Sequence, residues 1–267
     1  MQWILHARHQ AGRRDPAGSI AGGEAIRALL QEHHGYLRLT AEDPASFSTT
    51  DAAAALVDWA SELGEVMWQE GEESLVAVVE DAGVATSRGS KTSRELVYHT
   101  DVGPEIPDVV LLYTVRRAAE GGEFSIITAE QLYRSVGDDP ALVAELSASW
   151  LIDGSMVAPR PDTLLELPIL SVDGPSPRVV YNRARIERGH RLGARALEPQ
   201  RVAALDRLDE VLAGLEPEDS FVAEPGELLI ADNRAMLHTR SAFSGDGTPE
   251  HDRQLLRVWI HERTEAA

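Results

Sequence analysis

Three residues that can share one metal ion constrain this chain more than any other feature. His99-Thr100-Asp101 stands in the first half of the sequence, and His238 lies near its end. In a β-strand, residues two apart point to the same side, so His99 and Asp101 can converge on an ion that His238 also reaches. Two imidazoles and one carboxylate occupy one face of an octahedral ion and leave its other positions open. The alternative is a surface His-Asp pair and an unrelated half-buried histidine, since short motifs recur by chance.

Two arginines lie four residues apart in the apolar segment 252–260. The segment contains Leu, Val, Trp and Ile, which predicts a strand, and its period of two places Arg253 and Arg257 on one face. Burying a guanidinium is costly unless a counter-charge accompanies it. We therefore expect an anionic ligand at this face, and a dicarboxylate would supply the charge.

Taken in order, these motifs resemble those of the Fe(II)- and 2-oxoglutarate-dependent dioxygenases of the taurine dioxygenase, clavaminate synthase and carbapenem synthase type. The resemblance covers most of the chain from Tyr98 onward. An ordered set of motifs is more specific than any one of its members. The set consists of 98–101, 107–115, 120–123, 226–234, His238 and the Arg253/Arg257 pair.

The resemblance implies a role for each of the charged residues. It implies that His99, Asp101 and His238 hold iron and are the catalytic residues. It also implies that Arg253 binds the distal carboxylate of 2-oxoglutarate and that Arg257 faces the substrate. The two arginines could exchange these roles.

Two further segments bear on the ligand contacts that the resemblance implies. The segment 180–183 resembles the one that lines the family's substrate pocket, which makes Tyr181 and Asn182 candidate substrate-binding residues. The family usually carries Thr after a Gly-Gly-acidic turn, where its hydroxyl meets 2-oxoglutarate, whereas this chain has Phe124 followed by Ser125. Phe124 and Ser125 point to opposite faces of a regular strand, so either a bulge lets Ser125 substitute or the hydroxyl contact is lost.

The activity that the resemblance implies is oxidation, by default hydroxylation, of an unactivated C–H bond in a small substrate. Fe(II), 2-oxoglutarate and O2 are the expected cofactor and cosubstrates, and succinate and CO2 the expected co-products. Arg257 favours a carboxylate-bearing substrate, such as an amino acid or a natural-product intermediate, because a guanidinium offers paired donors.

Other outcomes and other functions stay open. Desaturation, cyclisation and epimerisation can follow from the same chemistry, whereas halogenation is not expected because halogenating relatives lack the carboxylate that Asp101 retains. One alternative is a non-oxidative jelly-roll metalloprotein that binds zinc or a small acid. Another is a catalytically degenerate member of the family.

Charge and composition limit the partners. The 44 acidic and 25 basic residues give a net charge of -19, which argues against nucleic acid or an anionic membrane as a partner. A carrier protein is compatible with the sequence, but nothing indicates one. Cysteine is absent, which excludes a disulfide scaffold and a thiolate metal site. With no apolar run of signal-peptide or membrane-span type, and ferrous iron to keep reduced, we expect a cytoplasmic protein.

We expect one domain over residues 1–267, with a mainly β, cupin-like jelly-roll (double-stranded β-helix) core flanked by helices. Apolar spacing predicts helices at 24–33, 50–62, 128–136, from Pro140 onward and at 199–215, and strands at 35–39, 109–115 and 124–127. The proline-rich stretch 153–178 predicts short strands and turns. Residues 81–95 predict a loop that is either a lid or a plain connector.

One basic cluster stands out in this acidic chain. It comprises Arg178, Arg183, Arg185, Arg188, Arg191 and Arg195. The functional interpretation is recognition of an anionic substrate or an acidic carrier domain. The other interpretation is a solvated face that balances local acids, and we favour it because charge runs are usually solvated.

Overall fold

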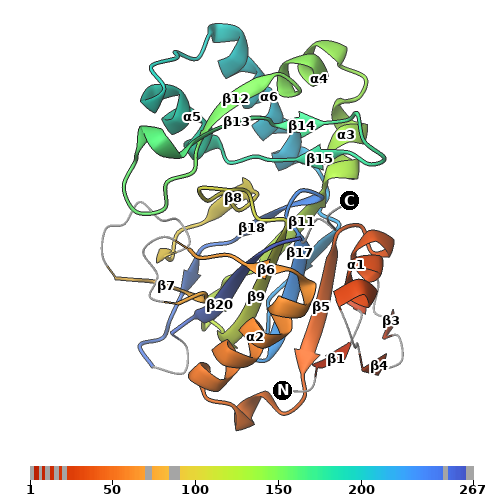
Figure 1. Cartoon of the computed structure of the whole chain (residues 1–267), viewed down its shortest axis with the longest axis vertical. Coiled ribbons are helices and arrows are strands. Elements are labelled where there is room, and N and C mark those ends of the chain that lie inside the picture. Colours follow the sequence, from red (N-terminus) through yellow and green to blue (C-terminus); the bar gives the residue numbers. More distant parts are fainter. Residues whose placement is uncertain are drawn as a thin grey trace.

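The computed structural model describes residues 23–69, 74–83, 91–248 and 252–262, together with four short strands before residue 20. These short strands are β1 (Trp3–Leu5), β2 (Arg8–His9), β3 (Arg13–Arg14) and β4 (Gly18–Ser19). Figure 1 shows long paired strands in the lower part of the molecule and a lobe of helices and short hairpins above them.

The larger sheet has the strand order β4-β1-β5-β17-β9-β20-β6, and β7 also pairs with β20. Its longer strands are β5 (Tyr36–Ala41), β9 (Val109–Arg116), β17 (Glu227–Asp232) and β20 (Gln254–His261), and its short ones are β6 (Glu65–Val66) and β7 (Ala77–Glu80). The central strands are buried on both faces, which explains their nearly continuous apolar sequences. The predicted strands 35–39 and 109–115 correspond to β5 and β9.

Two helices cover the outer face of this sheet (Figure 1), α1 (Gly23–Glu32) and α2 (Thr49–Leu63). Their apolar side chains pack with Leu256, Val258 and Ile260 of β20. Ser48 caps α2 and forms a reciprocal capping box with Asp51. Both helices match the predicted ranges to within one residue.

The smaller sheet has the order β16-β11-β18-β8 and faces the other side of the larger one. Its strands are β8 (Leu96–His99), β11 (Phe124–Thr128), β16 (Asp219–Phe221) and β18 (Met236–Arg240). Leu255 and Trp259, which alternate with the helix-facing residues of β20, pack against Phe124 and Ile126 of this sheet. Two facing antiparallel sheets with flanking helices confirm the predicted jelly-roll fold class.

The upper lobe contains four helices and two hairpins around a separate apolar cluster. They are α3 (Ala129–Val136), α4 (Pro140–Leu146), α5 (Arg183–Leu192) and α6 (Pro199–Gly214), with β12 (Ser149–Asp153) paired to β13 (Leu164–Pro168) and β14 (Leu170–Ser171) to β15 (Arg178–Val179). The helices α3, α4 and α6 and the short strands of 153–178 were predicted. Helix α5 was not, because its sequence RARIERGHRL carries no apolar stripe.

Smaller elements complete the chain. They are the helical turns η1 (Pro44–Ser46) and η3 (Pro161–Thr163) and the paired strands β10 (Glu120–Gly121) and β19 (Phe243–Ser244). Residues 84–90 of the predicted loop 81–95 lie outside the described residues, so the two alternatives of a lid and a plain connector both stay open. Among the helices in the described ranges, none is both long and apolar enough to cross a bilayer.

Candidate active site

Adjacent strands of the smaller sheet bring the three predicted metal ligands together. His99 ends β8 and is paired in register with His238 of β18, while Asp101 lies two residues beyond β8. The two imidazole centroids are 4.4 Å apart. One possible ligand atom from each of the three residues lies within 4.8 Å of those of the other two. The geometry therefore fits a single ion bound by two imidazole nitrogens and one carboxylate oxygen.

Burial keeps both imidazoles neutral, and His99 is also anchored by a hydrogen bond. The Nδ1–H of His99 donates to the Val97 carbonyl at 2.8 Å, which leaves Nε2 facing Asp101 Oδ1 at 4.0 Å. Burial lowers the pKa of His99, and burial together with His99 lowers the pKa of His238 to about 3. Neutral imidazoles with one nitrogen anchored are the usual state of metal-ligating histidines.

Asp101 is an anchored, ionised carboxylate. Its Oδ2 accepts hydrogen bonds from Trp259 Nε1 at 2.7 Å and from Arg257 Nη1 at 3.3 Å. Burial raises the pKa of this carboxyl, but the charge of Arg257 and the other neighbours outweigh it and hold the pKa at about 2. One oxygen is thus fixed by two donors, and the other faces the histidines.

Asn233 holds the backbone of the ligating segment, and the sequence prediction gave it no role. Its Oδ1 accepts from the Asp101 backbone N–H at 2.8 Å. Its Nδ2 donates to the carbonyls of Asp101 at 2.9 Å and Pro107 at 3.0 Å. Asn233 lies five positions before His238. It belongs to the 226–234 motif, and this membership was the sequence feature that could have indicated its role.

A small cavity joins the metal-ligating triad to three buried arginines, Arg240, Arg253 and Arg257. In the part of the chain that the structure describes, Arg253 Nη1 and the Nε and Nη1 atoms of Arg240 are buried without a hydrogen-bond partner. Burial and the neighbouring cation lower the pKa of Arg253 to about 9, and burial lowers that of Arg240 to about 10. Desolvated guanidinium donors on one cavity favour an anion there.

Strand parity predicted that Arg253 lies on the same face as Arg257, and both line this cavity. The sequence analysis gave no role to Arg240, which lines it as well. Arg240 lies two residues after His238 on β18, so the period of two already placed it on the ligand face. Arg253 lies over the rings of Phe124 and Phe243, with centroid distances of 5.6 and 5.1 Å. Both rings lie within cation–π range of the guanidinium.

The predicted contact of Ser125 with a cosubstrate is corrected by the structure. The pairing of β11 with β18 runs without a bulge, Phe124 opposite Arg240 and Ser125 opposite Thr239. Phe124 therefore faces the arginine cavity, and Ser125 points to the opposite face, where its hydroxyl hydrogen-bonds Ser220 Oγ at 2.8 Å. Regular alternation keeps the hydroxyl out of the cavity.

A second cavity, of about 290 Å³, opens beside the triad between β8, β20 and the start of α5. Asn182 lines it and caps α5, its Oδ1 accepting from the Arg185 backbone N–H at 3.3 Å. Arg257 also lines it, but its Nε donates to Gln69 Oε1 at 3.0 Å while Nη1 donates to Asp101.

Tyr181, predicted as a substrate-binding residue, does not line this cavity, and the prediction is corrected. Its side chain is fully buried in the upper lobe, and its hydroxyl donates to Asp209 of α6. The backbone of Tyr181 bonds with Thr100 instead, since the Tyr181 carbonyl accepts from the Thr100 N–H at 2.7 Å. Tyr181 thus contributes to the position of the ligating segment without facing a ligand.

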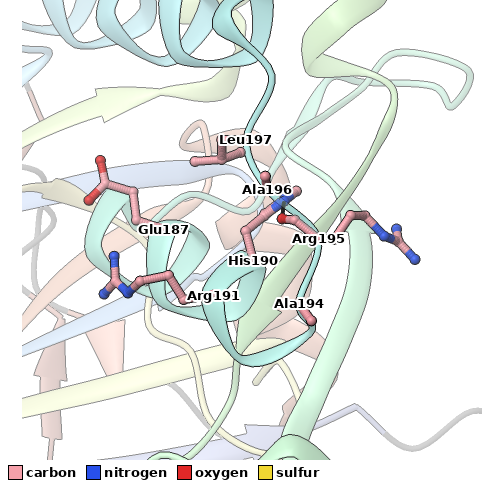
Figure 2. A pocket seen from close by; sticks show the side chains of 7 residues that line it. All are labelled: Glu187, His190, Arg191, Ala194, Arg195, Ala196 and Leu197. Carbon is pink, nitrogen blue, oxygen red and sulfur yellow. Dashed lines mark hydrogen bonds between the residues drawn. The ribbon is translucent and has the colours of Figure 1, made fainter.

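The hollow in Figure 2, of about 430 Å³, is a different feature, formed by the later part of α5 and the segment that follows it. Its labelled side chains diverge, with Glu187 and Arg191 extending to one side and Arg195 to the other. His190 is locked there, because its Nε2 accepts from the Leu151 N–H at 3.2 Å and its Nδ1 donates to the Arg195 carbonyl at 3.0 Å. Charged groups do not converge in this hollow, so we assign the site to the triad cavities.

Comparison with known sequences agrees with this assignment. A profile of the family described as "Taurine catabolism dioxygenase TauD, TfdA family" matches residues 14–259. FR-33289 synthase from Streptomyces rubellomurinus (strain ATCC 31215) is 28% identical over 210 residues, or 74% of this chain. The match spans 60% of the length of that relative.

Solved structures share the fold at lower sequence identity. An asparagine oxygenase in complex with Fe(II), 2S,3S-3-hydroxyasparagine and succinate has a TM-score of 0.67 and 21% identity, with 89% of this chain and 81% of that chain covered. The non-haem iron oxygenase OrfP in complex with Fe and α-ketoglutaric acid has a TM-score of 0.67 and 16% identity, with 89% and 78% covered. PvcB from Pseudomonas aeruginosa has a TM-score of 0.58 and 20% identity, with 90% and 80% covered.

Proposed function

We propose that this chain, which belongs to the taurine catabolism dioxygenase TauD, TfdA family, is an Fe(II)- and 2-oxoglutarate-dependent oxygenase that hydroxylates a small anionic molecule and releases succinate and CO2. The observation that carries the proposal is one cavity lined by the metal-ligating triad together with Arg240, Arg253 and Arg257. A 2-oxo dicarboxylate needs a metal at one end and a cation at the other. A zinc hydrolase has no general need for buried cations beside its metal.

The residues present fit the iron and the cosubstrate. Two neutral imidazoles and a carboxylate on one side of the ion form the donor set of non-haem Fe(II) oxygenases. In the proposed complex, Arg253 binds the distal carboxylate of 2-oxoglutarate, and Arg240 adds a second cation to the same cavity. Iron and 2-oxoglutarate supply the oxidising power when bound with O2, while the chain supplies positioning and excludes water.

The proposed substrate is an amino acid or another small natural-product acid in the 290 Å³ cavity. Structures of similar fold contain hydroxyasparagine and (3S)-hydroxy-L-Arg, which supports this class. Asn182 and Arg257 line the cavity and are the proposed substrate-facing residues. Because Asp101 keeps its carboxylate, we propose hydroxylation and not halogenation.

The setting of the reaction is also proposed. We place the protein in the cytoplasm as a single domain over residues 1–267. A net charge of -19 supports a small-molecule substrate over nucleic acid.

The test is an anaerobic titration of the protein with Fe(II) and then 2-oxoglutarate, followed by visible absorption. We expect a metal-to-ligand charge-transfer band in the wild type, no band in Asp101→Ala and a weakened band in Arg253→Met. Arg117→Met, which changes an exposed arginine paired with Glu224, is the control and keeps the band. Absence of the band from folded, iron-loaded wild type refutes the proposal.

A further inference from the structure

The basic cluster of 178–195 contains four arginines that pair with acids of the protein, the exposed Arg191 and the part-buried Arg185. Arg183 pairs with Glu187 at 2.7 Å, Asp206 at 2.8 Å and Asp209 at 2.9 Å. Arg188 pairs with the buried Asp153. The outer members Arg178 and Arg195 likewise pair with Asp232 at 2.7 Å and Glu166 at 2.8 Å.

Arg185 makes no ion pair with any residue in the described ranges, and it differs from the exposed Arg191 because it lines the 290 Å³ cavity. Its Nη1 donates to the carbonyls of Asp153 at 2.8 Å and Ser155 at 2.9 Å, and its Nη2 lies 3.6 Å from Met156 Sδ. Backbone carbonyls fix the direction of the guanidinium, and the carboxylates of Asp153 and Asp101 act on its charge without forming an ion pair with it among the described residues. Burial and the nearby Arg188 lower the pKa of Arg185 to about 10, as expected for a desolvated cation.

Arg185 also lines the 290 Å³ cavity together with the metal-ligating His99 and Asp101. The other cation of this cavity close to the triad, Arg257, already donates to Asp101 and Gln69. Glu95 is exposed at the rim, so solvent screens it. The uncompensated charge of the cavity is therefore positive and lies on the α5 side.

We propose, on the basis of the proposed function, that Arg185 binds an oxyanion group of the substrate and thereby determines its orientation over the metal site. The group is the carboxylate of an amino acid or another acid, or a larger oxyanion such as a phosphonate. Arg185 lies in the first turn of α5, and the positive end of the helix dipole there also favours a bound anion. Arg257 faces the same cavity and also positions Asp101.

The first experiment uses sulfate as the probe and thermal unfolding as the readout. The protein is loaded anaerobically with Fe(II) and 2-oxoglutarate, which fills the Arg253 cavity, and sulfate is titrated at constant ionic strength. We expect a saturable rise in Tm for the wild type and a loss of apparent sulfate affinity of about tenfold or more in Arg185→Gln, since one charge-assisted bond is removed. Arg191→Gln, an exposed arginine of the same helix outside the cavity, retains the wild-type response.

Arg185→Lys guards against a folding artefact, because it keeps the charge and should restore part of the response. No saturable response in the wild type, or an equal response in wild type and Arg185→Gln, overturns the proposal. The outcome does not depend on turnover: an Arg185-dependent response without a charge-transfer band would refute the oxygenase assignment and leave the anion site standing. A charge-transfer band without an Arg185-dependent sulfate response would refute only the anion site.

The second experiment identifies the oxyanion by substrate-stimulated consumption of 2-oxoglutarate. Acids that stimulate turnover are compared with their neutral carboxamides and with their phosphonate analogues. We expect the amide to lose stimulation, and Arg185→Gln to raise KM for the acid more than it lowers kcat. A neutral amide that is turned over as well as its acid contradicts the proposal.

Discussion

Trp259 donates its indole N–H to Asp101 Oδ2 at 2.7 Å, from a strand of the larger sheet to a ligand beside the smaller one. This bond fixes Oδ2, while Oδ1 of the same carboxylate faces His99 Nε2 at 4.0 Å. Trp259→Phe removes the donor and keeps a large aromatic ring, so we expect Fe(II) affinity to fall by about tenfold to a hundredfold.

Trp150→Phe is the matched control for this substitution. Trp150 is equally buried and its Nε1 donates at 3.1 Å to the Glu145 carbonyl, in the upper lobe. The Trp150→Phe substitution should lower the free energy of unfolding slightly and leave Fe(II) affinity unchanged. Equal Fe(II) affinity in Trp259→Phe and wild type would show that the indole does not position Asp101.

Asn233→Ala should weaken both the fold and the metal site. The substitution leaves a buried N–H and two buried carbonyls without their partner, and we expect the free energy of unfolding to fall by roughly 2–4 kcal/mol. Urea unfolding of the apo-protein measures the loss. Asn182→Ala, which removes the cap of α5, should cost only about 1 kcal/mol. Similar losses for the two variants would contradict the role of Asn233.

Ser125→Ala and Phe124→Leu separate the two faces of β11. Ser125 points away from the arginine cavity and Phe124 lines it. We expect Ser125→Ala to leave the dissociation constant for 2-oxoglutarate within about twofold of wild type, because surface changes of this kind are small. Phe124→Leu should weaken binding, since Arg253 loses a ring that covers it. Weaker 2-oxoglutarate binding in Ser125→Ala would restore the contact that the strand register excludes.

His261 should make stability depend on pH in a defined direction. Its Nε2 lies 2.7 Å from Glu105 and its Nδ1 3.2 Å from Asp108, and these carboxylates raise its pKa against the opposing effect of burial. A raised pKa in the folded state stabilises fully below the unfolded value of 6.5, and the contribution is lost as pH rises through the folded pKa. The urea midpoint of wild type should exceed that of His261→Gln most at about pH 5.5. The difference should be smallest at about pH 9, where the imidazole is neutral in both the folded and the unfolded state. A difference that grows with pH would contradict this assignment.

Spacing and parity were sufficient to predict that His99, Asp101 and His238 converge. His99 and Asp101 are two residues apart, and the alternation of β20 places Arg257 on the inner face with Leu255 and Trp259. These relationships depend only on the geometry of an extended strand. The long apolar strands and the amphipathic helices α2 and α6 were predictable for the same reason.

Contacts between distant segments were not predictable from local pattern. Helix α5 has Ile186 as its main apolar anchor, so its register follows from packing on β12 and not from a stripe. The direction of Tyr181 depends on Asp209 of α6, and the compensation of each arginine depends on which acids the fold brings near. Charge within 178–195 therefore indicated a cluster without indicating that Arg185 lines the cavity beside the triad.

The most direct test of the central claim is whether iron and 2-oxoglutarate bind as partners in one cavity. Isothermal titration calorimetry of 2-oxoglutarate, performed anaerobically with and without Fe(II), measures this coupling. We predict that Fe(II) tightens 2-oxoglutarate binding by about tenfold or more, that Asp101→Ala abolishes this gain, and that Arg253→Met weakens binding under both conditions. The same 2-oxoglutarate affinity with and without bound Fe(II) would contradict the account.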